Sequence, residues 1–290
     1  MKIGFLGPKA TFTDIAVRGL FPGGTAIPFP TIPACFDALA EEAIDLAVVP
    51  IENALEGSVN ITLDYLIHEA MFPIVGEVTA PIRQHLMVHP ANVNEWNEIK
   101  SVYSHSHAIA QCHKFLHSSL KGAQLVNTTS TAAAAKHIQD HPHEKAAAIA
   151  NLLAAEEYGL EIVKNDIHDF SHNHTRFIVI SKTAETLQTE KKEFKGHKTS
   201  VMVTLPDDRA GALHQVLSAF AWRKLNLSKI ESRPMKTGLG NYFFIIDIDM
   251  QEDEVLIPGV TAELEALGCK VNILGSYPSF QLGKDSLTVS

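Results

Sequence analysis

Features that mark secreted, membrane-spanning and thiolate-metal proteins are scarce in this sequence of 290 residues. Its 3 cysteines lie far apart with no CxxC pair, which argues against a disulfide framework and against a cysteine-ligated metal. No apolar run approaches the length that spans a bilayer. The apolar start of the chain is broken by Gly4, Gly7 and Pro8, unlike the core of a signal peptide. We therefore expect a protein of the cytoplasm, a reducing compartment, with no membrane partner.

Basic charge is also in short supply. The 24 lysines and arginines are outnumbered by 33 aspartates and glutamates, which gives a formal net charge of -9. Such a chain repels nucleic acid and anionic lipid, so we expect neither as a partner. Hydrophobic residues make up 46% of the chain, enough for a sizeable core, and the length favours two domains.

Motifs for common cofactors and nucleophiles are missing as well. The sequence has no G-x-S-x-G elbow, no dinucleotide-type glycine pattern and no Walker A loop, so we expect no nucleotide. The 15 histidines include three His-x-His pairs, namely His105 and His107, His141 and His143, and His172 and His174. His113 and His117 have helical spacing but lack the glutamate of a zinc-protease motif between them. We interpret the histidines as solvated surface residues and predict no metal and no cofactor.

The region 1–181 has the pattern of an α/β fold. Short β-branched runs alternate with alanine-rich, helix-like segments, which favours a mostly parallel sheet with helical crossovers. The predicted strands are 2–6, 45–50, 101–105, 123–127 and 175–180, and the predicted helices are 11–20, 57–70, 108–120 and 130–138.

Composition changes after residue 181. Polar and charged residues without apolar periodicity predict a linker over 182–198. A smaller βαββαβ pattern then fills 199–278, a reasonable size for one compact domain. Its predicted strands are 199–205, 227–233, 241–250 and 269–274, its helices are 211–224 and 254–268, and a turn falls at 238–240.

Polar loops after the predicted strands are the first place to look for chemistry. In open α/β sheets, ligands bind beyond the carboxyl ends of the strands, where helix N-termini favour anions. Thr11, Ser58, Ser104 and Thr131 fall in such loops, although each taken alone is better explained as a helix cap. As a set, the loops suit a small ligand that carries a carboxylate.

Charged residues in these segments have two interpretations each. Arg176 lies just inside an apolar strand, where a guanidinium needs a partner, and a ligand carboxylate and a structural ion pair are equally good candidates. Glu52 and Glu56 flank Asn53 in one loop and are either substrate-facing carboxylates or acidic residues at a helix start. Spacing alone does not choose between these alternatives.

The motifs, taken in order, resemble those of the prephenate dehydratase family over nearly the whole chain. The matching segments are GPKATFTDIA from Gly7, VVPIENALEGSVNITLDYL from Val48, YSHSHAIAQC from Tyr103, STAAAA from Ser130, AAAIANLLAAEEYGL from Ala146 and NHTRF from Asn173. The C-terminal part resembles an ACT domain, with GALH at 211–214 and ESRP at 231–234. The modest departures from the family pattern lie at Ala10, Ala54, Ser106 and His107.

The resemblance implies an α/β fold in which a two-lobed catalytic domain, like a periplasmic binding protein, precedes a βαββαβ, ferredoxin-like ACT domain. It implies that Thr175 is the key catalytic residue. Around the substrate it places Glu52, Asn53, Ser104, Gln111 and Arg176. In the ACT domain it implies a phenylalanine site made of Gly211, Ala212, Leu213, His214, Glu231, Ser232, Arg233 and Pro234.

The implied activity is the decarboxylating dehydration of prephenate to phenylpyruvate, regulated by L-phenylalanine. Because an aliphatic hydroxyl is a weak acid, we interpret Thr175 as a hydrogen-bond donor, with Glu52 or Glu56 as candidates to replace its proton. Arg176 would hold a substrate carboxylate. The sequence opens on the first strand of this domain, so we expect a monofunctional enzyme without a chorismate mutase domain.

Two alternative functions stay open. Arogenate dehydratase acts on the amino counterpart of the same keto acid, and only a comparison of substrates separates the two enzymes. A non-catalytic cytoplasmic amino-acid sensor would use the same fold, because fold does not fix function. The exposed sheet edges of a βαββαβ unit favour pairing with a second copy, so we expect a homodimer or homotetramer.

Overall fold

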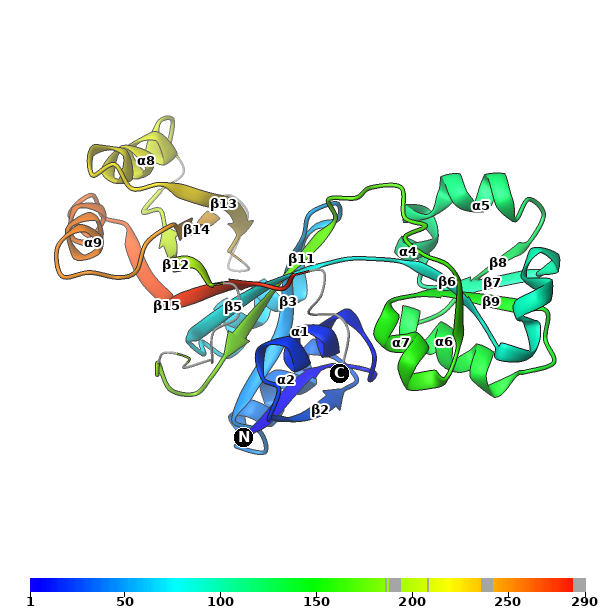
Figure 1. Ribbon diagram of the computed structural model, residues 1–290. Coiled ribbons are helices and arrows are strands. Elements are labelled where there is room, and N and C mark those ends of the chain that lie inside the picture. Colours follow the sequence, from blue (N-terminus) through cyan, green and yellow to red (C-terminus); the bar gives the residue numbers. More distant parts are fainter. Residues whose placement is uncertain (186, 188–193, 208, 236–241, 284–290) are drawn as a thin grey trace. The chain divides into compact units, whose positions relative to one another are not determined.

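The computed structural model of the protein describes residues 1–185, 187, 194–207, 209–235 and 242–283 (Figure 1). The chain forms two compact units. The first holds residues 1–70 and 78–178 together with the chain from Leu282 on, and the second holds residues 71–77 and 179–281. The second unit therefore includes residues 71–77, which lie about a hundred positions before the domain boundary that composition predicts. No helix in the described part of the chain is both long and apolar enough to cross a membrane.

The strands of the first sheet in the first unit follow the order β5-β11-β3-β1-β2, where β5 belongs to this unit from Val78 on and β11 up to Ile178. These strands are β1 (Lys2–Leu6), β2 (Thr25–Phe29), β3 (Leu46–Asn53), β5 (Ile74–Pro81) and β11 (His174–Ile180). Strand β1 pairs in parallel with both β2 and β3, as the alternating pattern predicts. Helices α1 (Phe12–Leu20) and α2 (Ile32–Ala40) pack against β1, and the short β4 (Gly57–Ser58) pairs antiparallel with β3.

The second sheet of this unit has the order β10-β6-β9-β7-β8. Its strands are β6 (His85–Val88), β7 (Ser101–Ser104), β8 (Gln124–Asn127), β9 (Ala146–Ala150) and β10 (Glu161–Lys164). Strand β7 is parallel to β8 and β9, whereas β6 is antiparallel to β9 and β10, so this sheet is mixed. Figure 1 shows α4 (Ser106–Gln111) and α5 (His113–Ser119) on one side of it, and α6 (Thr131–Asp140) and α7 (Leu152–Tyr158) on the other.

Two predicted helices are interrupted in the structure. The segment 57–70 is divided into β4, α3 (Asn60–Asp64) and a π-helical turn, η1 (Tyr65–Glu69). The segment 108–120 breaks at Cys112, whose φ of -113° and ψ of 18° end α4 and begin α5. Cys112 is fully buried in the core between these helices and the sheet, so packing at this position accompanies the break. A 3-10 segment, η2 (Pro90–Glu98), completes the unit.

The second unit follows the predicted βαββαβ order. Its elements are β12 (Phe194–Thr204), α8 (Ala212–Trp222), β13 (Leu227–Pro234), β14 (Tyr242–Ile248), α9 (Leu256–Ala266) and β15 (Lys270–Gln281). The strands take the order β13-β14-β12-β15, and both helices lie on the same face of this sheet (Figure 1). Val216 and Phe220 of α8 and Ile257 and Leu264 of α9 fill the core between helices and sheet.

Strand β12 begins earlier than the sequence pattern indicates. It starts at Phe194, so residues 194–198 of the segment predicted as a linker are strand. The reason is long-range pairing, because Phe194 lies opposite Phe280 in β15 and their rings are 6.2 Å apart. The turn predicted at 238–240 falls outside the described residues, and the domain limits 1–181, 182–198 and 199–278 stay predictions.

A buried carboxylate ties the early segment 71–77 to the rest of the second unit. Glu77 is 1% exposed. Its Oε1 accepts a hydrogen bond from Ser279 Oγ at 2.6 Å and lies 2.8 Å from Lys198 Nζ. A buried charge is tolerated only when it is paired and hydrogen-bonded, so these three side chains form an interdependent group.

Gly275 provides a test of this packing. A Cβ at this position would lie 2.1 Å from the backbone oxygen of Ile74, which cannot move aside as a side chain could. We expect Gly275→Ala to lower the free energy of unfolding by about 2 kcal/mol or more, measured by thermal denaturation. Gly23→Ala is the control, because nothing lies within 4 Å of its Cβ, and it should change stability little. Equal melting of the two variants would contradict the packing.

Candidate active site

A cleft of about 940 Å³ opens in the first unit. Its walls come from the loop after β1, the turn between β3 and β4, the loop and helix after β7, the start of α6, and strand β11. Both sheets of the unit therefore contribute loops at the carboxyl ends of parallel strands, where the sequence pattern places a ligand site.

Helices α1 and α6 begin at the wall of the cleft. Thr11 caps α1 by accepting a hydrogen bond from Asp14 N at 3.3 Å, as predicted. Ser130, and not the predicted Thr131, caps α6 by accepting from Ala133 N at 3.0 Å. Both N-termini have amide groups available for an anion.

The other two predicted caps are wrong. The residue at the N-cap of α3 is Val59 and not Ser58. His105 occupies the N-cap of α4, one position beyond Ser104. Ser104 is instead fully buried, and its Oγ donates to the backbone oxygen of Ile149 at 2.7 Å, a bond to a neighbouring strand that spacing cannot reveal.

The loop before α1 explains one departure from the family pattern. Ala10 has a φ of 63°, in the left-handed region that favours glycine. Its backbone is held on both sides, because Ala10 N donates to Asp14 Oδ2 at 2.7 Å and its oxygen accepts from Asn151 Nδ2 at 2.9 Å. These bonds keep the left-handed turn although the residue carries a Cβ.

Asn53 is the centre of a hydrogen-bond network at the cleft. Its Nδ2 donates to Thr175 Oγ1 at 2.8 Å, to Asn173 Oδ1 at 3.0 Å and to the backbone oxygen of His174 at 3.3 Å. Its Oδ1 accepts from the backbone amides of residues 55 and 56 at 3.0 and 3.1 Å. Because Thr175 Oγ1 accepts from Asn53, its own proton is free to be donated elsewhere.

The network continues across the cleft. Asn173 Nδ2 donates to Gln111 Oε1 at 3.2 Å, and Gln111 Nε2 donates to Glu56 Oε1 at 3.4 Å. Glu56 Oε2 lies 3.5 Å from His107 Nδ1. This series of contacts links strand β11 of the first sheet to helix α4, which follows strand β7 of the second sheet.

Gln84 is a further polar residue of the cleft, and sequence reasoning did not single it out. Its side chain lines the cleft and is 2% exposed. Among the described residues, nothing donates a hydrogen bond to its Oε1. A buried acceptor without a donor is costly, so a ligand or water that supplies a donor would be held at this point. Asn173 was likewise missed, although it lies two residues before Thr175.

Arg176 and Glu52 occupy a different place from Thr175. Successive side chains of a strand point to opposite faces, so Thr175 lines the cleft and Arg176 does not. Arg176 Nη1 forms an ion pair with Glu52 Oε2 at 2.8 Å, which is one of the two interpretations that its position in the strand allows. Of the six predicted catalytic residues, the structure brings Thr175, Asn53 and Gln111 to the cleft, but not Glu52, Ser104 or Arg176.

The electrostatics of the cleft favour a neutral imidazole at its edge. Burial lowers the pKa of His105, and the neighbouring His107 lowers it further. His105 Nδ1 accepts from His107 N at 3.4 Å, so the neutral ring carries its proton on Nε2. Among the described residues, the one cluster of three potential metal ligands lies outside the cleft.

Comparison with known proteins identifies the family. Residues 3–185 match the family model for prephenate dehydratase, and residues 199–268 match the model for the ACT domain. The chain belongs to the prephenate dehydratase family. The expected two-lobed α/β domain followed by a βαββαβ ACT domain is thereby confirmed.

Relatives of this prephenate dehydratase family member resemble it over nearly its whole length. It is 57% identical over 285 residues to the prephenate dehydratase of Bacillus subtilis. This match covers 97% of this chain and 100% of the relative. It is 32% identical over 293 residues to arogenate dehydratase 2 of Petunia hybrida. This match covers 96% of this chain and 72% of the relative. The solved prephenate dehydratase of Arthrobacter aurescens in complex with L-Phe is 35% identical, with a TM-score of 0.81 and 100% and 92% of the two chains covered.

The geometry around Asn53 predicts a pH-dependent defect in Asn53→Asp. The introduced carboxyl would face the oxygens of Asn173 and His174, which raises its pKa in the folded state above the usual ~3.9. The loss in free energy of unfolding should be small at pH values where the carboxyl is protonated in both the folded and the unfolded state. This loss should then grow by about 1.4 kcal/mol for each pH unit between the unfolded and the folded pKa.

Thermal unfolding at about pH 5 and about pH 7.5 measures this effect. The gap between the native protein and Asn53→Asp should widen at the higher pH. Asn94→Asp is the control, because Asn94 is exposed and the change in charge is the same. A gap that is independent of pH would contradict the prediction that facing these oxygens outweighs the two backbone amides that donate to Oδ1.

Proposed function

We propose that the protein converts prephenate to phenylpyruvate. In this reaction the bond between the ring and its carboxylate breaks, and carbon dioxide leaves. The electron pair moves through the ring and expels the hydroxyl on the opposite side, which departs as water after it takes up a proton. The ring becomes aromatic, so the protein has only to orient a dianion, to stabilise the leaving hydroxyl and to limit solvation of the departing carboxylate.

The observation that carries this proposal is the hydrogen bond from Asn53 to Thr175. It makes the Thr175 hydroxyl an acceptor toward Asn53, so the hydroxyl proton is free to be donated to the substrate. Thr175 is too weak an acid to give up this proton fully and acts as a hydrogen-bond donor to the leaving oxygen. Glu56 and His107 line the cleft, whereas Glu52 is paired with Arg176 and does not, so Glu56 is the carboxyl group placed to take part in a proton relay.

The substrate carboxylates have matching donors in the cleft. The N-termini of α1 and α6 line it at residues 11–13 and 129–131, and helix N-termini favour anions. The buried Oε1 of Gln84, which accepts no hydrogen bond from the described residues, would accept one from a hydroxyl, a group that prephenate carries. Roles for Glu52, Ser104 and Arg176 in contact with substrate stay predictions, because none of the three lines the cleft.

Thr175→Val tests the catalytic role directly. This change keeps the shape of the side chain and removes its hydroxyl, so kcat on prephenate should fall by about 100-fold or more. Thr175→Ser should retain more activity because it keeps the donor. Formation of phenylpyruvate is the measurement.

Thr62→Val is the matched control for loss of a threonine hydroxyl. Thr62 is fully buried and donates to Pro50 O at 2.7 Å, but it does not line the cleft. It should cost some stability and leave kcat near that of the native protein. If Thr175→Val and Thr62→Val had similar kcat values, Thr175 would be a structural residue.

Regulation by L-phenylalanine at the ACT domain is part of the proposal. The site would comprise residues 211–214 at the start of α8 and residues 231–234 in β13. Gly211 is the N-cap of α8, and nothing lies within 4 Å of where its Cβ would be, so the helix start is open to a ligand. Its amides would take the carboxylate of the amino acid. Glu231, whose side chain is 19% exposed, is one candidate partner for the ammonium group.

A second copy of the chain would complete this arrangement. Strand β13 ends the order β13-β14-β12-β15, and no described strand pairs with its outer edge. An open strand edge is covered economically by the same edge of another copy. We therefore propose a homodimer or homotetramer in the cytoplasm, in which L-phenylalanine favours one arrangement of subunits.

Gly211→Val tests the effector site. Gly211 has a φ of 85°, so any side chain strains the backbone as well as crowding the helix start. The control is Gly159→Val, because Gly159 has a φ of 61°, also lies in open space and ends helix α7 of the first unit. Calorimetry should show at least a ~10-fold loss of L-phenylalanine affinity in Gly211→Val alone. Turnover without effector should be near the native value in Gly211→Val, and unchanged effector affinity would refute the site.

The alternatives are separated by one assay on the purified protein. Incubation with prephenate and with arogenate, followed by detection of the aromatic product, distinguishes prephenate dehydratase from arogenate dehydratase. A sensor would bind either compound without forming product. The predicted independence from metal and cofactor is tested in the same assay by adding a chelator.

A further inference from the structure

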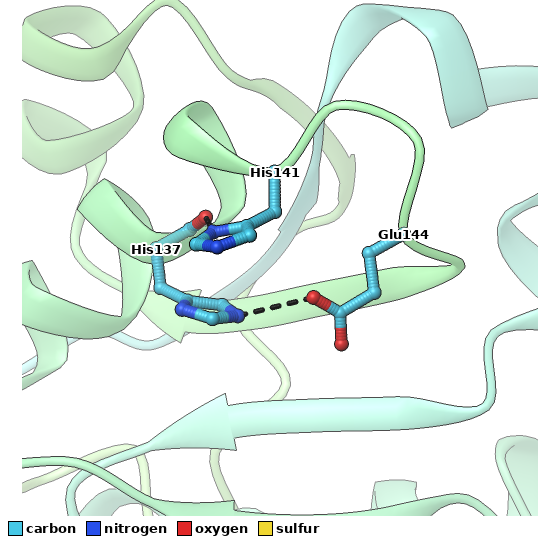
Figure 2. Close-up of side chains that lie close together, drawn as sticks. All are labelled: His137, His141 and Glu144. Atoms are coloured by element: carbon cyan, nitrogen blue, oxygen red, sulfur yellow. Dashed lines mark hydrogen bonds and ion pairs between the residues drawn. The ribbon is translucent and has the colours of Figure 1, made fainter.

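Three metal-ligating side chains meet on the second sheet of the first unit, outside the cleft (Figure 2). His137 lies in the last turn of α6, His141 is the C-cap of that helix, and Glu144 lies in the turn before β9. One ligand atom from each lies within 4.8 Å of the other two. The sequence pattern paired His141 with His143, whereas the helix brings it to His137, one turn earlier.

The hydrogen bond made by His141 Nδ1 leaves its Nε2 available as a metal ligand. His141 Nδ1 lies 2.8 Å from the backbone oxygen of His137. A carbonyl only accepts, so Nδ1 carries the proton, and the lone pair of the neutral ring is on Nε2. Metal-binding histidines usually have this kind of bond, which sets the tautomer and orients the ring.

Glu144 is oriented in the same way. Tyr103 donates its hydroxyl proton to Glu144 Oε1 at 2.7 Å, while Oε2 lies 3.1 Å from His137 Nε2. One oxygen is thus held by the protein, and the other faces the imidazoles.

Ring stacking holds His137 between its neighbours. Its ring centroid lies 4.2 Å from that of Tyr103 and 4.1 Å from that of His141. The nearby lysines do not neutralise Glu144, because Lys136 pairs with Asp140 and Lys145 pairs with Glu95 and Glu98. The cluster therefore offers two imidazole nitrogens and a carboxylate oxygen that no lysine pairs with in these contacts.

We propose that His137, His141 and Glu144 bind a zinc ion. The ligand atoms would be Nε2 of each histidine and Oε2 of Glu144, with water in the remaining position. Two imidazoles and a carboxylate suit zinc, with bonds of about 2.0–2.2 Å. The three side chains already place one potential ligand atom each within 4.8 Å of the others, and side-chain rotations that separate the stacked rings of His137 and His141 would bring them to such distances. The ion would replace the contact between His137 and Glu144, and the proton that His137 Nε2 donates in that contact would move to Nδ1 or to solvent. It would connect the end of α6 to the turn before β9.

Zinc titration of the full-length, chelator-treated protein tests the proposal. Calorimetry should show one site per chain, and zinc should raise the melting temperature because the ion binds only the folded protein. His141→Gln and Glu144→Gln should each weaken binding by about 10-fold or more. Both side chains are at or near the surface, so these variants should fold.

The matched control is His117→Gln. His113 and His117 are also one turn apart on a helix, with ring centroids 6.0 Å apart, but in the described part of the chain they do not form a group of three close ligands with a carboxylate. This variant should bind zinc like the native protein. An anomalous scattering peak among His137, His141 and Glu144 in zinc-soaked crystals would give the position of the ion. Equal losses in His141→Gln and His117→Gln, or no binding at millimolar zinc, would overturn the proposal.

Discussion

The side-chain amide of Asn53 sets the geometry of the cleft. Its two ends are chemically different, and the structure uses both, because Nδ2 donates to β11 while Oδ1 accepts from its own turn. Through Asn173 the same amide also positions Gln111. Residues that lie more than a hundred positions apart in the sequence are thus aligned by one planar group. The acceptor role of the Thr175 hydroxyl, on which the proposed chemistry depends, follows from that group.

The sequence could identify residue types at the site but not the face that each one occupies. Thr175 and Arg176 are adjacent in one motif, yet strand alternation sends the first to the cleft and the second to Glu52. The Ser104 hydroxyl is used by a neighbouring strand. No sequence pattern marks Gln84, because its distinguishing feature is a buried Oε1 to which no described group donates a hydrogen bond, and only the folded structure shows this. Pairings between distant segments decide these outcomes, and a linear pattern does not contain them.

The same reasoning separates the predictable parts of the fold from the others. Strands such as β1 and β7, and strands β12 and β14 of the second unit, have clear apolar runs. The structure confirms that these segments are strands and that the second unit has the βαββαβ order. Strand β9 reads AAAIA, a composition that favours helix, but all five of its residues are fully buried between neighbouring strands and helices. Small side chains there allow close packing against α6, so tertiary context overrides propensity.

The place of residues 71–77 has a practical consequence for dividing the protein. The chain contributes to the second unit from two separate stretches, so no single cut releases that unit intact. A chain ended before Lys198 would keep Glu77 and lose both Lys198 and Ser279, leaving a carboxylate without two of the groups that compensate its burial. Modular exchange of the regulatory part between relatives would therefore have to carry this short early stretch along with it, or replace Glu77 by an apolar residue.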